Sequence, residues 1–185
     1  MTFVKSIAME GGVILFVGGK SEAQEAIRIG ATNASLPFVS GRWIGGTLTN
    51  FPEIKKRITK LEDLTSKKEK GELSKYTKKE RLLIDRDIAK LTIFFSGISS
   101  MKAIPRAMFV IDPRKEHIAV AEAKSVGIPV VALAGSDCNL LDIDYPIPGN
   151  DASVSSIKLF VNKVVEAYKE GRDAKKEEKI TTVSE

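Results

Sequence analysis

Residues 41–57, with the sequence GRWIGGTLTNFPEIKKR, combine the groups that bind phosphate. Arginine and lysine neutralise phosphate charge, hydroxyls and amides hydrogen-bond its oxygens, and glycine lets a partner approach the backbone closely. The candidate phosphate-contacting residues are Arg42, Gly45, Gly46, Thr47, Thr49, Asn50, Lys55, Lys56 and Arg57. The stretch also holds the only tryptophan, Trp43. An alternative interpretation is a buried tryptophan beneath a glycine turn that leads into an ordinary helix.

A second candidate site begins at Gly18-Gly19-Lys20-Ser21, between a predicted strand and a predicted helix. Backbone N–H groups in such a loop can bind phosphate, but the loop matches neither the dinucleotide fingerprint nor the P-loop. The favoured interpretation is a tight turn between the strand and the helix. Five aspartates near strand ends could hold Mg²⁺, although aspartate is also common in helix caps and turns. These are Asp112, Asp137, Asp142, Asp144 and Asp151. Together, the loop and the aspartates define the alternative hypothesis of a nucleotide- or Mg-dependent α/β enzyme.

Catalytic side chains are scarce in this sequence. His117 is the only histidine, beside Arg114 and Lys115, and no nucleophile is partnered to it. Cys138 is the only cysteine, which rules out an intrachain disulfide and a multi-cysteine metal site. We therefore predict no catalytic residue, no metal site and no cofactor.

The positive charge of the chain is concentrated in its middle. The chain has 185 residues and a net charge of +5. Residues 52–90 contain 13 Lys and Arg against 8 Asp and Glu, so this segment carries the whole excess. The composition, 43% hydrophobic and 29% charged, is typical of a globular protein. We find no apolar run of the length needed to span a membrane, so no membrane partner is predicted.

The elements around these residues follow an α/β rhythm. Apolar runs predict strands at 13–17, 36–39, 107–111 and 128–134, and two prolines predict an edge strand at 145–148. Amphipathic patterns predict helices at 21–33, 112–126 and 151–170, with Asp112 as a cap and Pro113 at the first helical position. The N-terminal residues are typical of the last turns of a helix. The β-α-β order predicts a parallel sheet with helices on its faces.

Residues 50–95 interrupt that rhythm with two helices. The first runs from a cap at Asn50 to about Ser66, and the second from Thr77 to Phe95, with a polar loop between them. Apolar positions spaced by three and four give each helix only a narrow apolar stripe, which predicts a projecting antiparallel hairpin. The predicted organisation is an α/β domain from 1–49 and 96–171, an inserted hairpin at 50–95 and a disordered tail at 172–185.

Four blocks of this sequence, in order, resemble the family of bacterial small-subunit ribosomal protein two. They are ILFVGGKSEAQEA, RWIGGTLTNF, FVIDPRKEHIAVAEAKSVGIPVVAL and DYPIPGND. The resemblance spans about residues 1–171 and implies a flavodoxin-like α/β fold with an inserted helical hairpin. It also implies a non-enzymatic structural constituent of the small ribosomal subunit, located on the ribosome in the cytoplasm.

The resemblance also implies partners and contact residues. The partners are the small-subunit (16S) rRNA and neighbouring small-subunit proteins, including the large mRNA-binding ribosomal protein one. Direct rRNA contact is expected from Arg42, Thr47, Asn50 and the cations that follow, with Trp43 packing inside. Members of the family usually begin with a further segment that includes their first strand. We therefore expect the strand at the centre of the flavodoxin order to be missing from this chain.

Overall fold

The computed structural model describes residues 1–183, with side chains described through residue 175. A parallel sheet of five strands forms the centre of an α/β body, which confirms the predicted fold class. The strands are β1 (Ile14–Val17), β2 (Phe38–Val39), β3 (Ala107–Ile111), β4 (Val130–Ala134) and β5 (Tyr145–Pro148). In the part of the chain that the structure describes, no helix is long and apolar enough to cross a membrane.

The expectation of a missing central strand is wrong. The strand order is β2-β1-β3-β4-β5, which is the flavodoxin order, and β1 occupies the position between β2 and β3. Phe16 of β1 is in register with Phe38 on one side and with Phe109 on the other. The run VILFV therefore supplies the strand that was expected to lie before residue 1.

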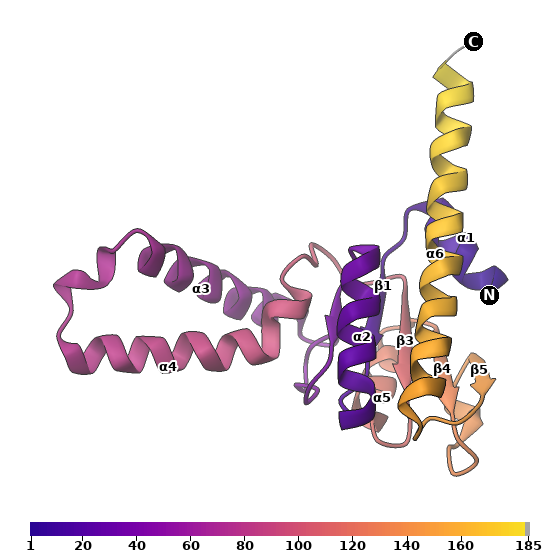
Figure 1. Ribbon diagram of the computed structural model, residues 1–185, viewed down its shortest axis with the longest axis horizontal. Coiled ribbons are helices and arrows are strands. Elements are labelled where there is room, and N and C mark those ends of the chain that lie inside the picture. Colours follow the sequence, from indigo (N-terminus) through magenta and orange to yellow (C-terminus); the bar gives the residue numbers. More distant parts are fainter. Residues whose placement is uncertain (184–185) are drawn as a thin grey trace.

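Helices cover both faces of the sheet because alternate residues of each strand point to opposite faces (Figure 1). Ile14 and Phe16 belong to one core, which they share with helices α1 (Thr2–Glu10), α2 (Ser21–Ala34) and α6 (Val154–Val183). Leu15 and Val17 belong to the other core, which they share with helix α5 (His117–Ser125) and the base of the hairpin. All four of these strand side chains are fully buried.

The inserted hairpin projects from the body, as predicted (Figure 1). Helix α3 (Phe51–Glu69) runs outward and helix α4 (Lys78–Phe95) returns. A short 3-10 helix, Glu72–Lys75, closes the tip within the segment predicted as a loop. The N-cap of α4 forms a capping box: the Thr77 hydroxyl accepts from the Glu80 N–H, and Glu80 accepts from the Thr77 N–H. Two further 3-10 helices are Ser96–Ile98 and Leu140–Asp142.

The base of the hairpin shares one core with the sheet. Phe51, Ile54, Leu91 and Phe95 are buried in the same cluster as Trp43. Burying an apolar side chain of this size contributes roughly 1.5–3 kcal/mol to stability. The hairpin is therefore fixed to the body at its base, while its outer half depends on the narrow seam between two helices.

The start of α5 differs from the prediction. Asp112 does not cap this helix, which begins at His117 after a series of turns. The φ angle of Asp112 is 59°, so its backbone is left-handed, and its side chain accepts from the N–H of Lys115. Aspartate tolerates this conformation better than most residues, and the turn delays the helix.

Helix α6 is longer than predicted. It continues to Val183, whereas the sequence suggested a helix end near Glu170 and a disordered tail over 172–185. The tail has little apolar periodicity, but it is rich in lysine and glutamate, which favour helix without needing a buried face. Residues 184–185, the rest of the predicted tail, lie outside the described residues.

Candidate nucleic-acid interface

The loop between β2 and α3, residues 41–50, follows the carboxyl end of a strand, and we call it the signature loop. Trp43 in this loop is buried, as predicted, and its Nε1–H donates to the Glu122 carboxylate over 3.0 Å. Thr47 is 2% exposed, and its hydroxyl donates to the carbonyl of Ile44 over 2.6 Å. The loop is therefore folded against the core, and two of its most distinctive side chains face inward.

Glu122, on helix α5, is the anchor of this loop and was not found from the sequence. Its carboxylate accepts from the backbone N–H groups of Gly46, Leu48 and Thr49 at 2.7, 3.0 and 3.2 Å. The Thr49 hydroxyl adds a further bond at 3.2 Å. The carboxylate thus occupies the centre of a ring of donors, the position in which an external anion would otherwise bind.

The electrostatics of Glu122 follow from these bonds. Burial by itself would raise the pKa of this carboxyl, because the charged form loses hydration. The hydrogen bonds from Trp43, Leu48, Gly46 and Thr49 outweigh burial and lower its pKa below the ordinary value. Glu122 is therefore ionised in the fold at neutral pH.

The outward-facing part of the site consists of the remaining candidates. The side chains of Arg42, Asn50, Lys55 and Arg57 are exposed and make no hydrogen bond or ion pair with a described residue. Lys56 is also exposed, but its ammonium pairs with Glu53 at 2.6 Å. Asn50 occupies the N-cap position of α3 without the side-chain cap that the sequence predicted. These groups remain available to a partner.

The two glycines of the loop differ in what they require. Gly46 has a φ of +90°, a conformation that other residues rarely adopt, and its N–H binds Glu122. Gly45 has no such angle, and a side chain built there would meet no atom within 4 Å. Gly46 therefore shapes the loop, whereas Gly45 leaves open space beside it.

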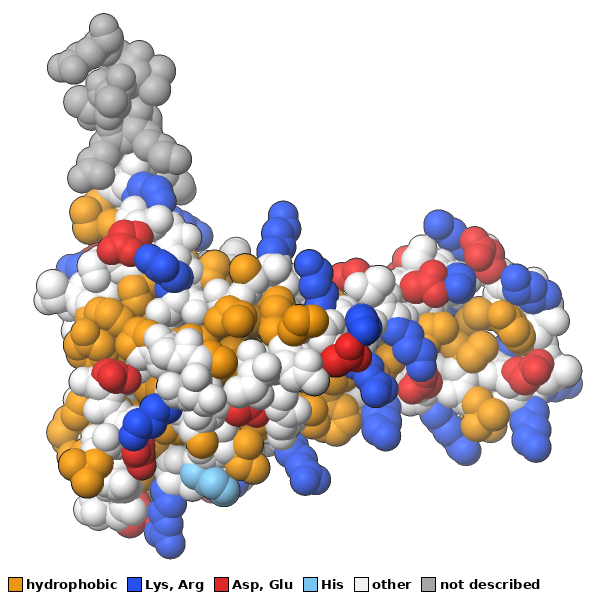
Figure 2. All heavy atoms as spheres, turned by 180° about the vertical axis from the view of Figure 1, so that it is seen from behind, with side chains coloured by type: hydrophobic (Ala, Val, Ile, Leu, Met, Phe, Trp, Pro, Cys, Tyr) orange, Lys and Arg blue, Asp and Glu red, His pale blue; other side chains and the backbone are white. Residues whose placement is uncertain are grey.

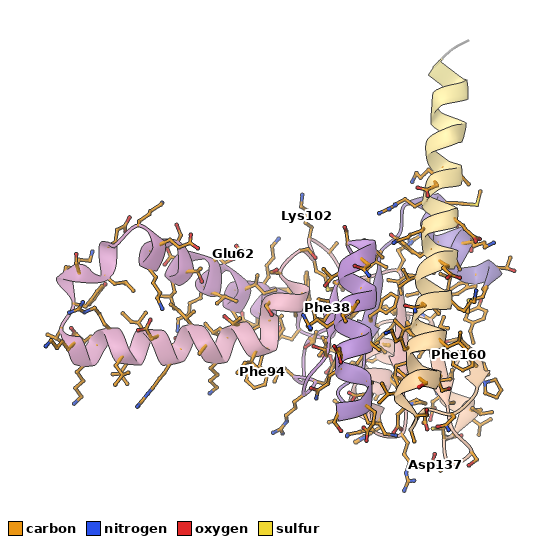
Figure 3. The ribbon with its side chains drawn as sticks, viewed as in Figure 1. Phe38, Glu62, Phe94, Lys102, Asp137 and Phe160 are labelled. Atoms are coloured by element: carbon orange, nitrogen blue, oxygen red, sulfur yellow. The ribbon has the colours of Figure 1, made fainter. Side chains whose placement is uncertain are left out.

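A groove of 490 Å³ lies where the signature loop meets both hairpin helices, and we call it the junction groove. Its walls include apolar side chains from the loop and from α4, and its rim includes polar groups from the loop, α3 and α4. Its lining includes the apolar Ile44, Leu91 and Phe94 and the polar Asn50, Arg57 and Lys90. Figure 3 places Phe94 near the body end of α4. Figure 2 shows lysine and arginine side chains projecting from the hairpin.

The second candidate site is filled by internal partners. The Gly19 N–H donates to Glu116 over 3.0 Å, and the Lys20 ammonium pairs with Asp112 at 3.1 Å. A side chain on Gly19 would approach the carbonyl oxygen of Gly41 to 2.6 Å, so the two glycine loops are in contact. The N–H that would bind a phosphate under the alternative hypothesis therefore binds a carboxylate of the chain itself, in agreement with the tight-turn interpretation.

The strand-end aspartates are likewise engaged within the fold. Asp144 accepts from the Val130 N–H at 2.8 Å, and Asp151 accepts from the Gly135 N–H at 3.2 Å. Asp137 pairs with Arg114, and Asp142 pairs with Lys124. Ligand atoms of Asp112, Cys138 and Asp151 do lie within 4.8 Å of one another. All three groups already have internal partners, since Asp112 pairs with Lys20, Asp151 accepts from Gly135 and the Cys138 thiol donates to Asp137. The arrangement therefore matches the turn and cap interpretation.

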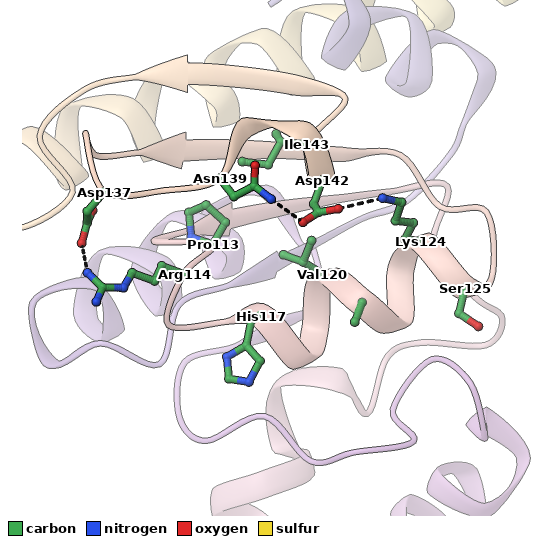
Figure 4. A pocket seen from close by; sticks show the side chains of 11 residues that line it. Pro113, Arg114, His117, Val120, Lys124, Ser125, Asp137, Asn139, Asp142 and Ile143 are labelled. Carbon is green, nitrogen blue, oxygen red and sulfur yellow. Dashed lines mark hydrogen bonds and ion pairs between the residues drawn. The ribbon is translucent and has the colours of Figure 1, made fainter.

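A hollow of 610 Å³ lies beside α5 (Figure 4). The Arg114–Asp137 pair stands at one end, and Asp142 receives bonds from Lys124 and Asn139 at the other. His117, the only histidine, is exposed on its margin. No described nucleophilic side chain is hydrogen-bonded to it, so this hollow presents no catalytic pair.

Comparisons with known proteins agree with these structural features. Residues 1–171 match the family model described as "Ribosomal protein S2". The chain is 50% identical over 169 residues to "Small ribosomal subunit protein uS2" of Bdellovibrio bacteriovorus. That alignment covers 91% of this chain but 54% of the relative, so the chain spans about half the length of that protein.

Proposed function

Because this chain belongs to the ribosomal protein S2 family, we propose that it is a structural constituent of the small ribosomal subunit. In this role it binds small-subunit rRNA in the cytoplasm and supports translation without catalysing a reaction. The uS2 protein of Bdellovibrio bacteriovorus, which is 50% identical to this chain over the aligned region, is named for that subunit.

The observation that carries the rRNA contact is a set of unpaired cations at the base of the hairpin. Arg42, Lys55 and Arg57 are exposed, and none forms an ion pair with a described residue. Other hairpin cations are paired, such as Lys67 with Asp63 and Lys68 with Asp85. Lys78, Lys79 and Arg81 near the tip also form no ion pair with a described residue, but they lie far from the signature loop. RNA phosphates would supply the counter-charge that the chain itself does not provide for Arg42, Lys55 and Arg57.

The filled state of the two glycine loops favours this role over an enzyme. In each loop, a glutamate of the chain occupies the backbone donors that a nucleotide phosphate would need. A partner therefore meets exposed side chains, which suits a large polyanion more than a small nucleotide. A thermal melt with ATP, GTP and Mg²⁺ checks this point. We expect no shift in the melting temperature, and a shift of several degrees would support the enzyme.

The test of rRNA binding compares two triple variants with the same change in charge. Arg42→Ala, Lys55→Ala and Arg57→Ala remove the unpaired cations, whereas Arg28→Ala, Lys158→Ala and Lys163→Ala remove exposed cations from α2 and α6. Binding to transcribed small-subunit rRNA is measured across salt concentrations. The first triple should lower the slope of log affinity against log salt by about two to three, because each lost phosphate contact lowers it by roughly 0.7–0.9.

Two results would contradict the proposal. The unmodified chain could fail to bind the rRNA even at low salt and fail to sediment with small subunits. Alternatively, the two triple variants could weaken binding equally, which would remove the base of the hairpin from the interface.

We also propose that the hairpin helps to dock ribosomal protein one and contacts neighbouring small-subunit proteins. Leu82 and Leu83, toward the tip on α4, are 51% and 54% exposed. Apolar side chains at such positions contribute little to the fold and suit a protein contact. Replacing both with serine should leave rRNA binding unchanged and reduce the ribosomal protein one retained on purified subunits. Unchanged retention would exclude this surface.

A further inference from the structure

The junction groove offers an apolar surface that the fold does not cover. Phe94 and Ile44 are only half-buried, and Leu91 and Ile54 form buried walls beneath them. Its volume of 490 Å³ is within the range of about 300–1,000 Å³ that is typical of sites for small organic groups. A partner that enters this groove must therefore present a compact group with an apolar face.

The charges around the groove favour an anionic partner. Its two acidic residues are already neutralised, since Glu53 pairs with Lys56 and Asp87 pairs with Lys60. Its two cations, Arg57 and Lys90, are exposed and form no ion pair with a described residue. The rim therefore carries uncompensated positive charge above an apolar wall.

Neutral hydrogen-bonding groups and open space lie on the same rim. The Asn50 amide is exposed and makes no hydrogen bond to a described residue, so both its donor and acceptor are available. Beside it, a side chain on Gly45 would meet no atom within 4 Å, so a flat group can approach the backbone closely.

An aromatic surface, free cations and a free amide are the combination that recognises an unpaired nucleotide. Proteins stack unpaired RNA bases on aromatic side chains, hydrogen-bond their edges with amides and hold the adjacent phosphates with arginine or lysine. A base within a duplex cannot reach such a groove, because its faces are covered by its neighbours. A protein side chain could fill the apolar part but would leave Arg57 and Lys90 without counter-charge.

We propose that the junction groove binds one unstacked nucleotide of the small-subunit rRNA. Its base lies against Phe94 and Ile44, its edge meets Asn50, and its flanking phosphates lie against Arg57 and Lys90. This inference rests on the proposed rRNA binding. Beyond that binding, it states that the protein recognises a single unpaired base as well as the phosphate backbone.

The experiment separates stacking from charge with variants of one helix. Phe94→Leu removes the ring but keeps an apolar side chain, and Phe94→Tyr keeps the ring. Ile93→Ala changes the neighbouring residue, which is 74% exposed and outside the groove, and serves as the matched control. Affinity for transcribed small-subunit rRNA is measured across salt concentrations. Thermal melts verify that each variant is folded.

We expect Phe94→Leu to weaken binding about tenfold without changing the salt slope, because stacking involves no counterion release. Phe94→Tyr and Ile93→Ala should bind like the unmodified chain. Lys90→Gln should instead lower the salt slope by about one. A single-stranded oligouridylate should displace rRNA from the Phe94→Leu variant less effectively than from the unmodified chain. An RNA duplex of equal length should displace rRNA equally well from both proteins.

Three outcomes would overturn the groove site. Phe94→Leu could bind rRNA like the unmodified chain, or Phe94→Tyr could be as weak as Phe94→Leu. Thirdly, Phe94→Leu could bind rRNA normally yet lose a protein neighbour from assembled subunits, which would assign the groove to a protein side chain. If the unmodified chain itself binds no rRNA, the proposed function fails first.

Discussion

The two glycine loops at the carboxyl edge of the sheet are held by two glutamates from one short segment, yet the glutamates differ in charge behaviour. Glu116 accepts one backbone N–H, from Gly19, and burial raises its pKa. Glu122 is also buried, but it accepts from the Trp43 ring N–H and from backbone N–H groups of the same signature loop. These bonds lower its pKa. The number of donors therefore decides whether burial or hydrogen bonding determines the charge state.

The contact of Glu116 with the Gly19 loop is less important for the fold than the contact of Glu122 with the signature loop. The Gly19 loop is a short turn between β1 and α2, and the backbone at both of its ends is already fixed by regular structure. The signature loop has no regular structure from Ser40 to Asn50, so its conformation depends on the donors gathered by Glu122. Glu122 therefore fixes the backbone of the loop that carries the exposed side chains of Arg42 and Asn50.

The largest expected change in stability follows from replacing Glu122. Glu122→Ala should lower the free energy of unfolding by about 3 kcal/mol, because several buried donors lose their acceptor together. Glu116→Ala leaves a single donor without a partner and should cost about 1 kcal/mol. Urea denaturation measures both. Equal losses in the two variants would remove the distinction between the loops.

The pH dependence of stability should have opposite signs for the two glutamates. The folded pKa of Glu122 lies below its ordinary value of 4.5, so its contribution is present above that value and is lost as pH falls through the folded pKa. The folded pKa of Glu116 lies above 4.5, so its contribution is present below that value and is lost as pH rises through the folded pKa.

Glutamine variants make these signs measurable. The stability difference between the unmodified chain and Glu122→Gln should shrink as the medium becomes more acidic than pH 4.5. Relative to the unmodified chain, Glu116→Gln should become more stable as pH rises above 4.5. Urea unfolding at a series of pH values provides both curves, and parallel curves would contradict the assigned shifts.

A smaller effect is expected from the two glycines of the signature loop. Gly46→Ala forces a side chain onto a backbone with φ of +90° and should cost about 1–2 kcal/mol. Gly45→Ala, at the adjacent position with open space, should change stability by less than about 0.5 kcal/mol. Thermal melts of both variants compare the loop at two successive residues. A large loss at Gly45 would mean that its backbone is also strained.

The smallest effect concerns the N-caps of the two hairpin helices. Thr77→Ala removes a capping box and should cost about 1 kcal/mol. Asn50→Ala removes a side chain that makes no cap bond, so it should change stability little while weakening rRNA binding. A stability loss at Asn50 as large as that at Thr77 would assign it to the fold.

The sequence predicts most of this fold because most of its signals are local. The run VILFV predicts a buried strand, of which Ile14–Val17 form β1, and the spacing of Phe51, Ile54 and Ile58 predicts a helix with one apolar face. The turn at Asp112 was missed because its left-handed backbone depends on the loop as a whole. The length of α6 was missed because a polar helix has no periodicity to detect.

The candidate site was only half predictable. The exposure of the cations and the burial of Trp43 can be predicted from residue type. The inward direction of the backbone N–H groups cannot. Glu122 is far from the signature loop in sequence, in a segment that reads as an ordinary amphipathic helix. Its one signal is that an acid stands between Val120 and Ala123, where the helix buries its apolar side chains. Such a residue needs internal donors, but the sequence does not identify them.

The position of the hairpin within the sheet order has a consequence for folding kinetics. Strand β1 pairs with β3, so Ile14 must find Ala107 on the far side of the whole insertion. Closing a long chain segment costs entropy, and non-local strand pairs usually form slowly. Two helices that form early and pair along their seam would bring Phe51 and Phe95 together and shorten the segment left to close. The insertion that we propose to contact rRNA would then also act as an internal guide for assembly of the sheet.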